Sequence, residues 1–237
     1  MRRAISLALS ALVSALLIGP ALAAAASFVV VEARGVDLVP GAAIDGSKPL
    51  TLGEGQEVVL ISSAGRTLKL LGPYNQAPAE AAGASGTDVA AALSSLLAQQ
   101  GSRTDRVGLV RGLQREVVPP QPWLVDVTHA GNRCVREGQP IMLWRSEGEA
   151  AAKLVIAPYD RSWRILADWP AGVHEVAAPK SVPFHDDATY IISLDGAEKT
   201  INLISIPATV DTDAMRVGWM VEKGCRAQAQ ALVRSLQ

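Results

Sequence analysis

Short apolar runs, separated by turn residues about every 8–12 positions, dominate the sequence from Trp123 to Ile206. The clearest of them has apolar side chains at every second position, at Trp163, Ile165, Ala167 and Trp169. A period of two residues places such side chains on one face of a β-strand. Short strands at this spacing are typical of a β-sandwich or an open barrel. We therefore predict a mainly β chain with a C-terminal β-sandwich, Ig-like or an open barrel, over residues 122–237.

The N-terminal part of the chain also has the pattern of β-structure. Glu57–Ile61 and Thr67–Leu71 are apolar runs of strand length, and they flank the short glycine-containing stretch Ser62–Arg66. Two such runs around a short turn indicate a β-hairpin. We predict a small N-terminal β module over residues 24–75.

A helical linker is predicted between the two β regions, over residues 76–121. It opens with residues 76–87, which are mostly Ala, Gly, Pro and Ser and therefore favour a loop. A helix over about residues 88–100 is expected to follow, with Thr87 or Asp88 as its cap. Its apolar side chains share one face at helical spacing, at Val89, Leu93, Leu96 and Leu97.

Residues 1–23 have the order of a secretory signal peptide. Arg2 and Arg3 provide the positive start, Ala4–Ile18 is an uncharged apolar run, and Ala21–Ala23 supplies an A-x-A cleavage site. The apolar run has about 15 residues, fewer than the roughly 20 that span a bilayer, so we favour cleavage after Ala23 over an uncleaved anchor. Because no later run is long and apolar enough to span a membrane, the expected product is an exported periplasmic protein.

A terminal α-helix completes the predicted C-terminal domain. Asp211 or Thr212 is its expected N-terminal cap, and Gly224 is expected to kink or divide it. Cys225 lies on its apolar stripe, whereas Cys134 lies in a β segment. Export places both cysteines in an oxidising compartment, so we predict a Cys134–Cys225 disulfide, with two unpaired buried thiols as the alternative. The disulfide would tie the terminal helix to the sheet.

Charge and motif content argue against several function classes. The chain has 22 Lys and Arg against 23 Asp and Glu, which argues against nucleic-acid binding through bulk electrostatics. It has no Walker A loop and no H-E-x-x-H sequence, and Gly53-Glu54-Gly55 lacks the third glycine of a dinucleotide fingerprint. We therefore expect no nucleic-acid partner and no cofactor.

The densest polar cluster is His185-Asp186-Asp187. Its residue types suit a hard-metal or general-base site, to which His129 and Asp126 would be the additional contributors. Three adjacent side chains do not converge on one ion without an unusual turn, so the other interpretation is an acidic loop. We predict no metal ligand and no catalytic residue, and we keep the cluster as the place to test for an enzyme.

Four of the five tryptophans lie in the C-terminal β region, at Trp123, Trp144, Trp163 and Trp169. They would form either an aromatic platform for a sugar or peptide, or part of the core. The core is favoured, because Trp163 and Trp169 share a strand face with Ile165.

Leu50–Leu60 contains a Gly-Glu-Gly turn, and it is followed by Gly65 and by Leu70-Leu71-Gly72-Pro73. In these positions residues 50–73 resemble the periplasmic β-domain of FecR-type iron-dicitrate sensors. The resemblance implies a β recognition module. The cytoplasmic anti-sigma segment and the membrane span of those sensors have no counterpart in this sequence, so the resemblance implies recognition without a signalling output of its own.

These observations favour an exported, non-enzymatic binding module whose partner is an envelope protein or a cell-wall component. An exported hydrolase with a site near His185, Asp186 and Asp187 is the first alternative. A structural envelope component is the second. The ligand, the oligomeric state and the contact between the two β regions do not follow from the sequence.

The predicted leader has a direct test. Protein isolated from the periplasm is expected to begin at Ala24, or within a few residues of it, because Ala24–Ala26 offer alternative cleavage points. Mass spectrometry of the N-terminal peptide measures this start. A protein that keeps Met1 and sediments with membranes would contradict the prediction.

Overall fold

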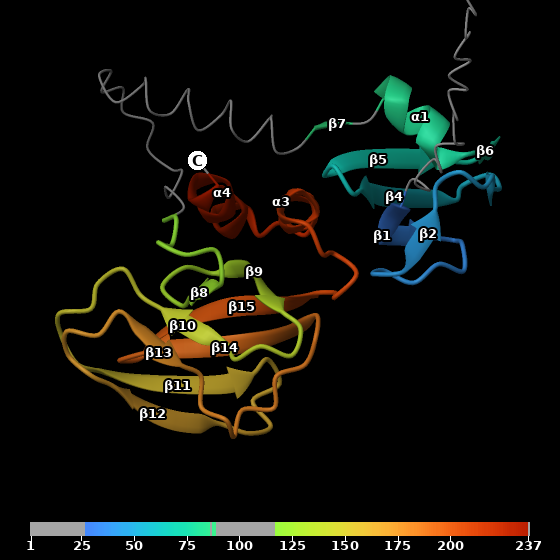
Figure 1. Cartoon of the computed structure of the whole chain (residues 1–237). Helices are drawn as coiled ribbons and strands as arrows, with labels where there is room; N and C mark the ends of the chain where they lie inside the picture. Colours follow the sequence, from blue (N-terminus) through green and yellow to red (C-terminus); the bar gives the residue numbers. More distant parts are fainter. Residues whose placement is uncertain (1–26, 86, 89–116, 237) are drawn as a thin grey trace, which may run out of the picture.

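The computed structural model describes residues 27–85, 87–88 and 117–236. In this part of the chain two β units lie on either side of a layer formed by two helices, α3 and α4 (Figure 1). The fold is mainly β, as predicted. The leader with Ala23 and the helix predicted over residues 88–100 lie outside the described residues.

The N-terminal unit contains a five-stranded sheet with the order β2-β1-β4-β5-β7, and a small sheet in which β3 pairs with β6. Its elements are β1 Ser27–Arg34, β2 Ala43–Asp45, β3 Leu50–Leu52, β4 Glu57–Ser62, β5 Arg66–Leu71, β6 Tyr74–Gln76, α1 Pro78–Ser85 and β7 Thr87–Asp88. The antiparallel pair β4–β5 is the predicted hairpin. Gly65 has a φ of 75° at its turn, a conformation that glycine adopts at little cost.

Both faces of this N-terminal sheet are buried. In β1, Phe28 and Val30 contribute to one core, while Val29 and Val31 contribute to another. The first core includes Leu52 and the alanines of α1, and the second includes the helical layer. A strand that is covered on both faces is apolar along its length instead of alternating. This is why β1 and β4 are continuous apolar runs in the sequence.

The structure corrects the loop predicted over residues 76–87. Pro78–Ser85 forms α1, and Thr87–Asp88 forms β7, which pairs with β5. Proline suits the first position of a helix, because the N–H that it lacks would have no partner there. Small side chains favour a loop in isolation. In α1 they pack closely on the sheet, since Ala79, Ala81 and Ala82 are partly buried against its core.

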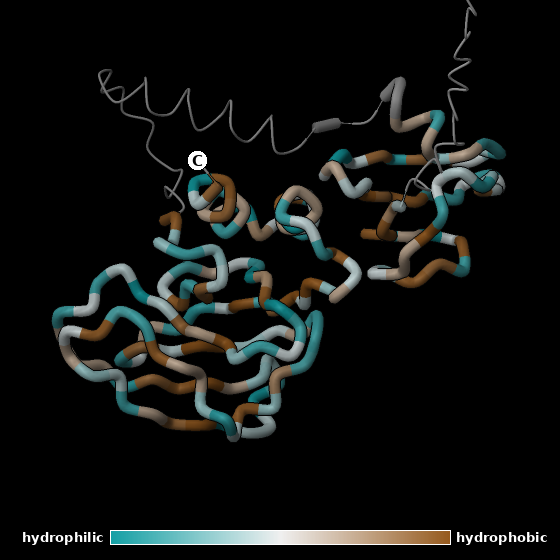
Figure 2. The backbone as a smooth tube through the Cα atoms, in the orientation of Figure 1, coloured by the Kyte–Doolittle hydropathy of each residue, from teal (hydrophilic) through white to brown (hydrophobic). Residues whose placement is uncertain are grey.

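The C-terminal unit is a sandwich of two sheets with the orders β12-β11-β14-β15-β9 and β13-β10-β8. Its strands are β8 Leu124–Asp126, β9 Gly131–Arg136, β10 Met142–Trp144, β11 Ala152–Pro158, β12 Ile165–Trp169, β13 Glu175–Ala177, β14 Ala188–Leu194 and β15 Ala197–Ile206. The core between the sheets contains Val125 and Leu143 from one side and Ile156, Trp169 and Ile192 from the other. The predicted β-sandwich is confirmed. Figure 2 shows the apolar residues concentrated along these strands.

The buried side chain of Arg145 organises one end of the sandwich. It follows β10 and lies with its guanidinium 5.0 Å from the centre of the Trp169 ring. The guanidinium donates hydrogen bonds of 2.7–3.2 Å to the carbonyls of Gly148, Ala150, Pro170 and Val173. A buried charge is tolerated where its donors are satisfied in this way. Arg145 therefore fixes the two loops that close this end.

The predicted terminal helix is divided in two, as expected from Gly224. Helix α3 spans Asp213–Glu222 and α4 spans Arg226–Ser235, and Gly224 has a φ of 77° between them. The cap prediction for Thr212 is confirmed, since its hydroxyl accepts a hydrogen bond of 3.1 Å from the backbone N–H of Met215. This satisfies one of the free N–H groups at the start of a helix.

The two helices join the β units through a shared core. Val59 and Ile61 of the N-terminal sheet, Ile204 of β15, and Trp219 and Leu232 of the helices belong to one cluster of buried side chains. The helices and the two β units therefore share one hydrophobic core. The sequence did not predict whether the two β regions contact each other, and the structure shows that they are packed together through the helices.

Helix α4 is attached to strand β9 in two ways. The predicted disulfide is present, with 5.8 Å between the Cα atoms of Cys134 and Cys225. In addition, the buried side chain of Gln228 accepts a hydrogen bond of 2.7 Å from the Cys134 N–H and donates one of 2.8 Å to the Cys134 carbonyl. Its amide also donates to the Pro122 carbonyl at 3.0 Å. The side chain thus replaces a neighbouring strand at the open edge of β9.

Replacement of this amide is expected to destabilise the fold. Gln228→Leu would leave the buried N–H and carbonyl of Cys134 without partners, at a cost of about 2–3 kcal/mol in the free energy of unfolding. Gln230→Leu is the matched control on the same helix, because Gln230 is half-buried and its side chain forms no hydrogen bond to the described part of the chain. Urea titration of both oxidised variants measures the difference. Equal midpoints would contradict the role assigned to Gln228.

Candidate functional site

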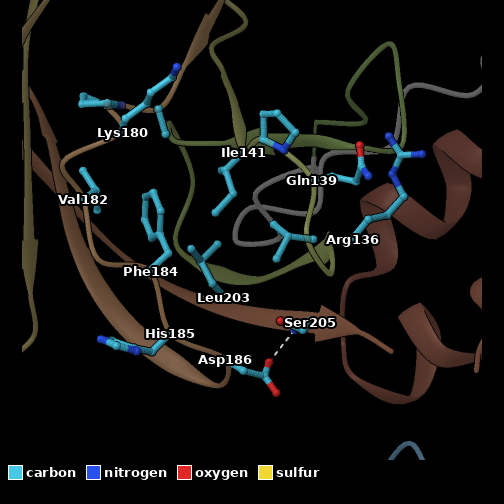
Figure 3. Close-up of a pocket in the computed structure, with 14 residues that line it drawn as sticks. Arg136, Gln139, Ile141, Lys180, Val182, Phe184, His185, Asp186, Leu203 and Ser205 are labelled. Atoms are coloured by element: carbon cyan, nitrogen blue, oxygen red, sulfur yellow. Dashed lines mark hydrogen bonds between the residues drawn. The ribbon is translucent and has the colours of Figure 1, made fainter. Parts of the chain in front are cut away.

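A cavity of about 410 Å³ opens at the end of the sandwich opposite Arg145. We call it the end cavity. Three segments that are far apart in the sequence form it (Figure 3): residues 135–141 from β9 and the turn after it, residues 178–186 before β14, and Leu203 and Ser205 at the end of β15. Strand pairing brings them together, because the start of β14 lies beside Leu203 and the end of β15 lies beside Arg136.

The end cavity has an apolar floor and a polar rim. The floor is formed by Val135, Ile141, Val182, Phe184 and Leu203, of which Val182 and Leu203 are buried. The polar residues that line it are Arg136, Gln139, Lys180, His185, Asp186 and Ser205. In Figure 3, Phe184, Ile141 and Leu203 point toward its centre. An apolar cavity with a few polar groups at its mouth is the usual form of a small-molecule site.

Several polar groups on this rim are available to a ligand. The guanidinium of Arg136 lies 4.5 Å from the centre of the Trp123 ring, a cation–π contact that orients the group. Within the residues that the structure describes, the side chains of Arg136, Gln139 and Lys180 have no hydrogen bond and no carboxylate partner. All three side chains are exposed at the rim.

The acidic residues of the predicted cluster are used in structural hydrogen bonds. One carboxylate oxygen of Asp186, Oδ1, accepts hydrogen bonds from the backbone N–H of Ser205 at 2.6 Å and of Asp187 at 2.9 Å. Asp187 accepts one from the side-chain amide of Asn202 at 3.1 Å, and its φ is 50°. The cluster therefore ties the segment before β14 to strand β15. This agrees with the acidic-loop interpretation.

His129 and Asp126 form a separate turn and do not join that cluster. Asp126 is buried, and its carboxylate lies 2.8 Å from Nδ1 of His129 and accepts hydrogen bonds from the backbone and hydroxyl of Thr128. Arg133 donates to the carbonyls of Asp126 and His129. Among the described residues, no hydroxyl or thiol forms a hydrogen bond to Nε2 of His129. His129 and Asp126 therefore do not form a catalytic triad with a described nucleophile.

No metal centre is formed in the described ranges, since they contain no group of three or more His, Cys, Asp or Glu side chains placed to hold an ion. The third histidine, His174, is held at the closed end of the sandwich, where its Nδ1 lies 3.2 Å from the carbonyl of Arg145. In the same part of the chain, no helix is long and apolar enough to cross a membrane.

The tryptophans belong mainly to the core, as predicted. Trp169 and Trp144 are buried, and the indole N–H of Trp169 donates to the Val173 carbonyl at 2.8 Å. Trp163 is partly buried against the same core, with its ring centre 6.3 Å from that of Tyr190. Trp123 is partly buried against the core of the helical layer, and its ring also contacts the guanidinium of Arg136 at the rim of the end cavity.

A second hollow lies on the outer face of the larger sheet. It has a volume of about 560 Å³, and its floor includes Val155 and Ile191. Arg161 and Glu198 form one wall and are joined by two hydrogen bonds of 3.0 and 2.8 Å. The bonds from Arg161 hold the pKa of the Glu198 carboxyl below its usual value. Because this wall is an exposed ion pair whose donors and acceptors are engaged, the hollow offers less to a ligand than the end cavity.

The rim residues Arg136 and Lys180 were not expected from the sequence. Each is a single basic residue in a polar segment, and neither belongs to a motif with characteristic spacing. Their common position follows from the pairing of β9, β14 and β15, which is a property of the whole domain.

Comparison with known proteins gives no family for this chain. No protein-family model matches the sequence, and no curated protein is significantly similar to it. The function is therefore argued from the geometry and chemistry of the site.

The role of Asp186 can be tested through stability. Asp186→Ala removes the acceptor for two backbone N–H groups, and we expect it to lower the free energy of unfolding by about 1 kcal/mol. Asp186→Asn keeps a side-chain oxygen in the same place and is expected to retain most of that stability. Thermal denaturation of both variants measures the effect. An unchanged melting temperature for Asp186→Ala would instead favour the catalytic interpretation of this cluster.

Proposed function

We propose that this protein is an exported binding protein of the cell envelope that holds its ligand in the end cavity. The observation that carries the proposal is the contrast between two sets of polar residues. Of those suited to catalysis, Asp126, His129, Asp186 and Asp187 are engaged in hydrogen bonds within the fold, whereas the imidazole of His185 has no side-chain partner among the described residues. Those that line the mouth of the cavity, such as Arg136 and Lys180, are unpaired within the described residues.

Export is supported by two independent features. The leader ends in an A-x-A sequence at Ala23. The Cys134–Cys225 disulfide is of a kind that persists in oxidising compartments such as the periplasm. The proposed location is therefore the periplasm, after removal of the leader.

The N-terminal unit is proposed to recognise an envelope protein or a cell-wall component. Residues 50–73, which resemble FecR-type sensor domains, form β3, β4 and β5 and the turns between them. Recognition through the turns and edges of such a unit needs no catalytic group. The unit shares a core with the helical layer, so a partner bound there would be held in a fixed position relative to the sandwich.

The hydrolase alternative near His185 has less support. Its carboxylates have structural partners, and the imidazole of His185 has no hydrogen bond to a described side chain that would orient it as a general base. A structural envelope component remains the other alternative. It would leave the end cavity without a ligand.

Site-specific photo-cross-linking in living cells tests the proposal. A photoreactive benzoylphenylalanine is placed at Gln139, on the rim of the cavity, or at Glu149, an exposed control position at the closed end. After irradiation, intact mass spectrometry of the purified protein is expected to show an adduct at position 139 that is absent at position 149. Equal labelling at both positions, or none at either, would overturn the proposal that the end cavity is a binding site.

A further inference from the structure

We propose that the end cavity binds a single-chain amphiphile whose head group is an anion, either a carboxylate or a phosphate monoester. The inference rests on the proposed function and adds to it the chemical class of the ligand. It combines the apolar floor of the cavity, its size and the charge at its mouth.

The floor suits an apolar chain. Ile141, Phe184 and Leu203 point into the cavity and present hydrocarbon surface to its interior (Figure 3). The volume of about 410 Å³ lies at the lower end of the range for small-molecule sites, roughly 300–1,000 Å³. Burial of an alkyl chain on such a surface removes apolar area from water, and this favours binding.

The mouth suits an anion. Arg136 and Lys180 lie on opposite sides of the cavity (Figure 3), and neither is paired with a carboxylate in the ranges that the structure describes. The contact between Arg136 and the face of Trp123 uses none of the guanidinium N–H groups, so these remain free to donate to a ligand. A guanidinium and an ammonium group are the usual partners of carboxylates and phosphates.

One carboxylate, that of Asp186, also lines the cavity. Its Oδ1 already accepts hydrogen bonds from two backbone N–H groups, which offset part of its charge. Figure 3 shows it at the opposite side of the apolar floor from Lys180 and Gln139. With two cationic side chains against one hydrogen-bonded carboxylate, the charged lining as a whole favours an anion over a cation.

An amphiphile fits this lining better than a peptide does. A peptide would bring backbone N–H and carbonyl groups onto a floor whose side chains are all hydrocarbon, and each polar group buried there without a partner would cost free energy. A single alkyl chain has no such groups. Its polar atoms are confined to one end, which can meet the polar side chains of the rim while the alkyl chain lies on the apolar floor.

Titration calorimetry with ligands of equal chain length tests the inference. The mature protein, isolated from the periplasm and passed over a hydrophobic resin to remove bound lipid, is titrated with decanoate, decyl phosphate, decanol and decyltrimethylammonium. At least one of the two anions is expected to bind at least about tenfold more tightly than decanol, and the cation is expected to bind more weakly still. The stronger anion identifies a carboxylate or a phosphate head group.

Two sets of variants locate the binding. Arg136→Gln combined with Lys180→Gln is expected to weaken anion binding by about tenfold or more and to leave decanol binding unchanged. Arg164→Gln combined with Arg226→Gln removes the same charge from exposed residues that do not line the cavity, and it is expected to have no effect on the affinity. Ile141→Trp fills the cavity and is expected to weaken binding of every ligand.

The outcomes separate this inference from the proposed function. Equal affinity for decanoate, decyl phosphate and decanol, or no effect of the Arg136 and Lys180 substitutions, would overturn the assignment of an anionic ligand. So would binding of a short peptide with an apolar C-terminal residue in the absence of binding by either anion. In each of these cases a cross-link at position 139 in cells would still support a ligand in the cavity, while its absence would remove the proposed function as well.

Discussion

The attachment of helix α4 to strand β9 is the interaction on which the arrangement of the whole chain depends. β9 pairs with β15 along one side only, and its other side would expose unpaired backbone groups. Gln228 pairs with the N–H and carbonyl of Cys134, and the disulfide to Cys225 fixes the same point covalently. The disulfide joins two cysteines that are 91 residues apart in the sequence. In the chain-entropy model, such a cross-link lowers the conformational entropy of the unfolded chain and so stabilises the folded state by about 4–5 kcal/mol.

Once α4 is held against β9, the remaining layers follow from burial of apolar surface. The helices share a buried core with Ile204 and Ile206 on the outer face of the larger sheet, and Gly218 of α3 lies close to Ile61 of the N-terminal sheet. That sheet has apolar residues on both faces, so it needs a cover on each side. Without the helical layer, both β units would expose an apolar face to water.

The two ends of the sandwich differ in how tightly their loops are packed, and this difference accounts for the position of the candidate site. At one end, the buried guanidinium of Arg145 holds four carbonyls from two loops. At the other end, the segments that contain Arg136 and Lys180 stand apart around an apolar floor. The strands of the sandwich thus hold these segments apart and leave Arg136 and Lys180 exposed at the rim of the end cavity.

Local sequence patterns correctly predicted those elements whose formation depends mainly on residues close together in the sequence. Alternation predicted β12, the glycine-containing turn predicted the β4–β5 hairpin, and the hydroxyl of Thr212 was one of two expected caps. Helix α1 was missed, because the small residues that form it resemble a loop until the sheet beneath them is considered. Gln228 and Arg145 were missed as well. Polar residues are expected at the surface, and here their burial depends on carbonyls and N–H groups distant in the sequence.

The sequence by itself predicted the fold class, the β4–β5 hairpin, a kink or division of the terminal helix at Gly224, and the pairing of its two cysteines in preference to two free thiols. Each prediction rests on residue type and spacing, and the cysteine pairing also on the predicted export. Only the tertiary structure decided that Arg136 and Lys180 share the rim of one cavity. They lie 44 residues apart in the sequence, and strand pairing, which buries the apolar face of each strand, is what brings them together.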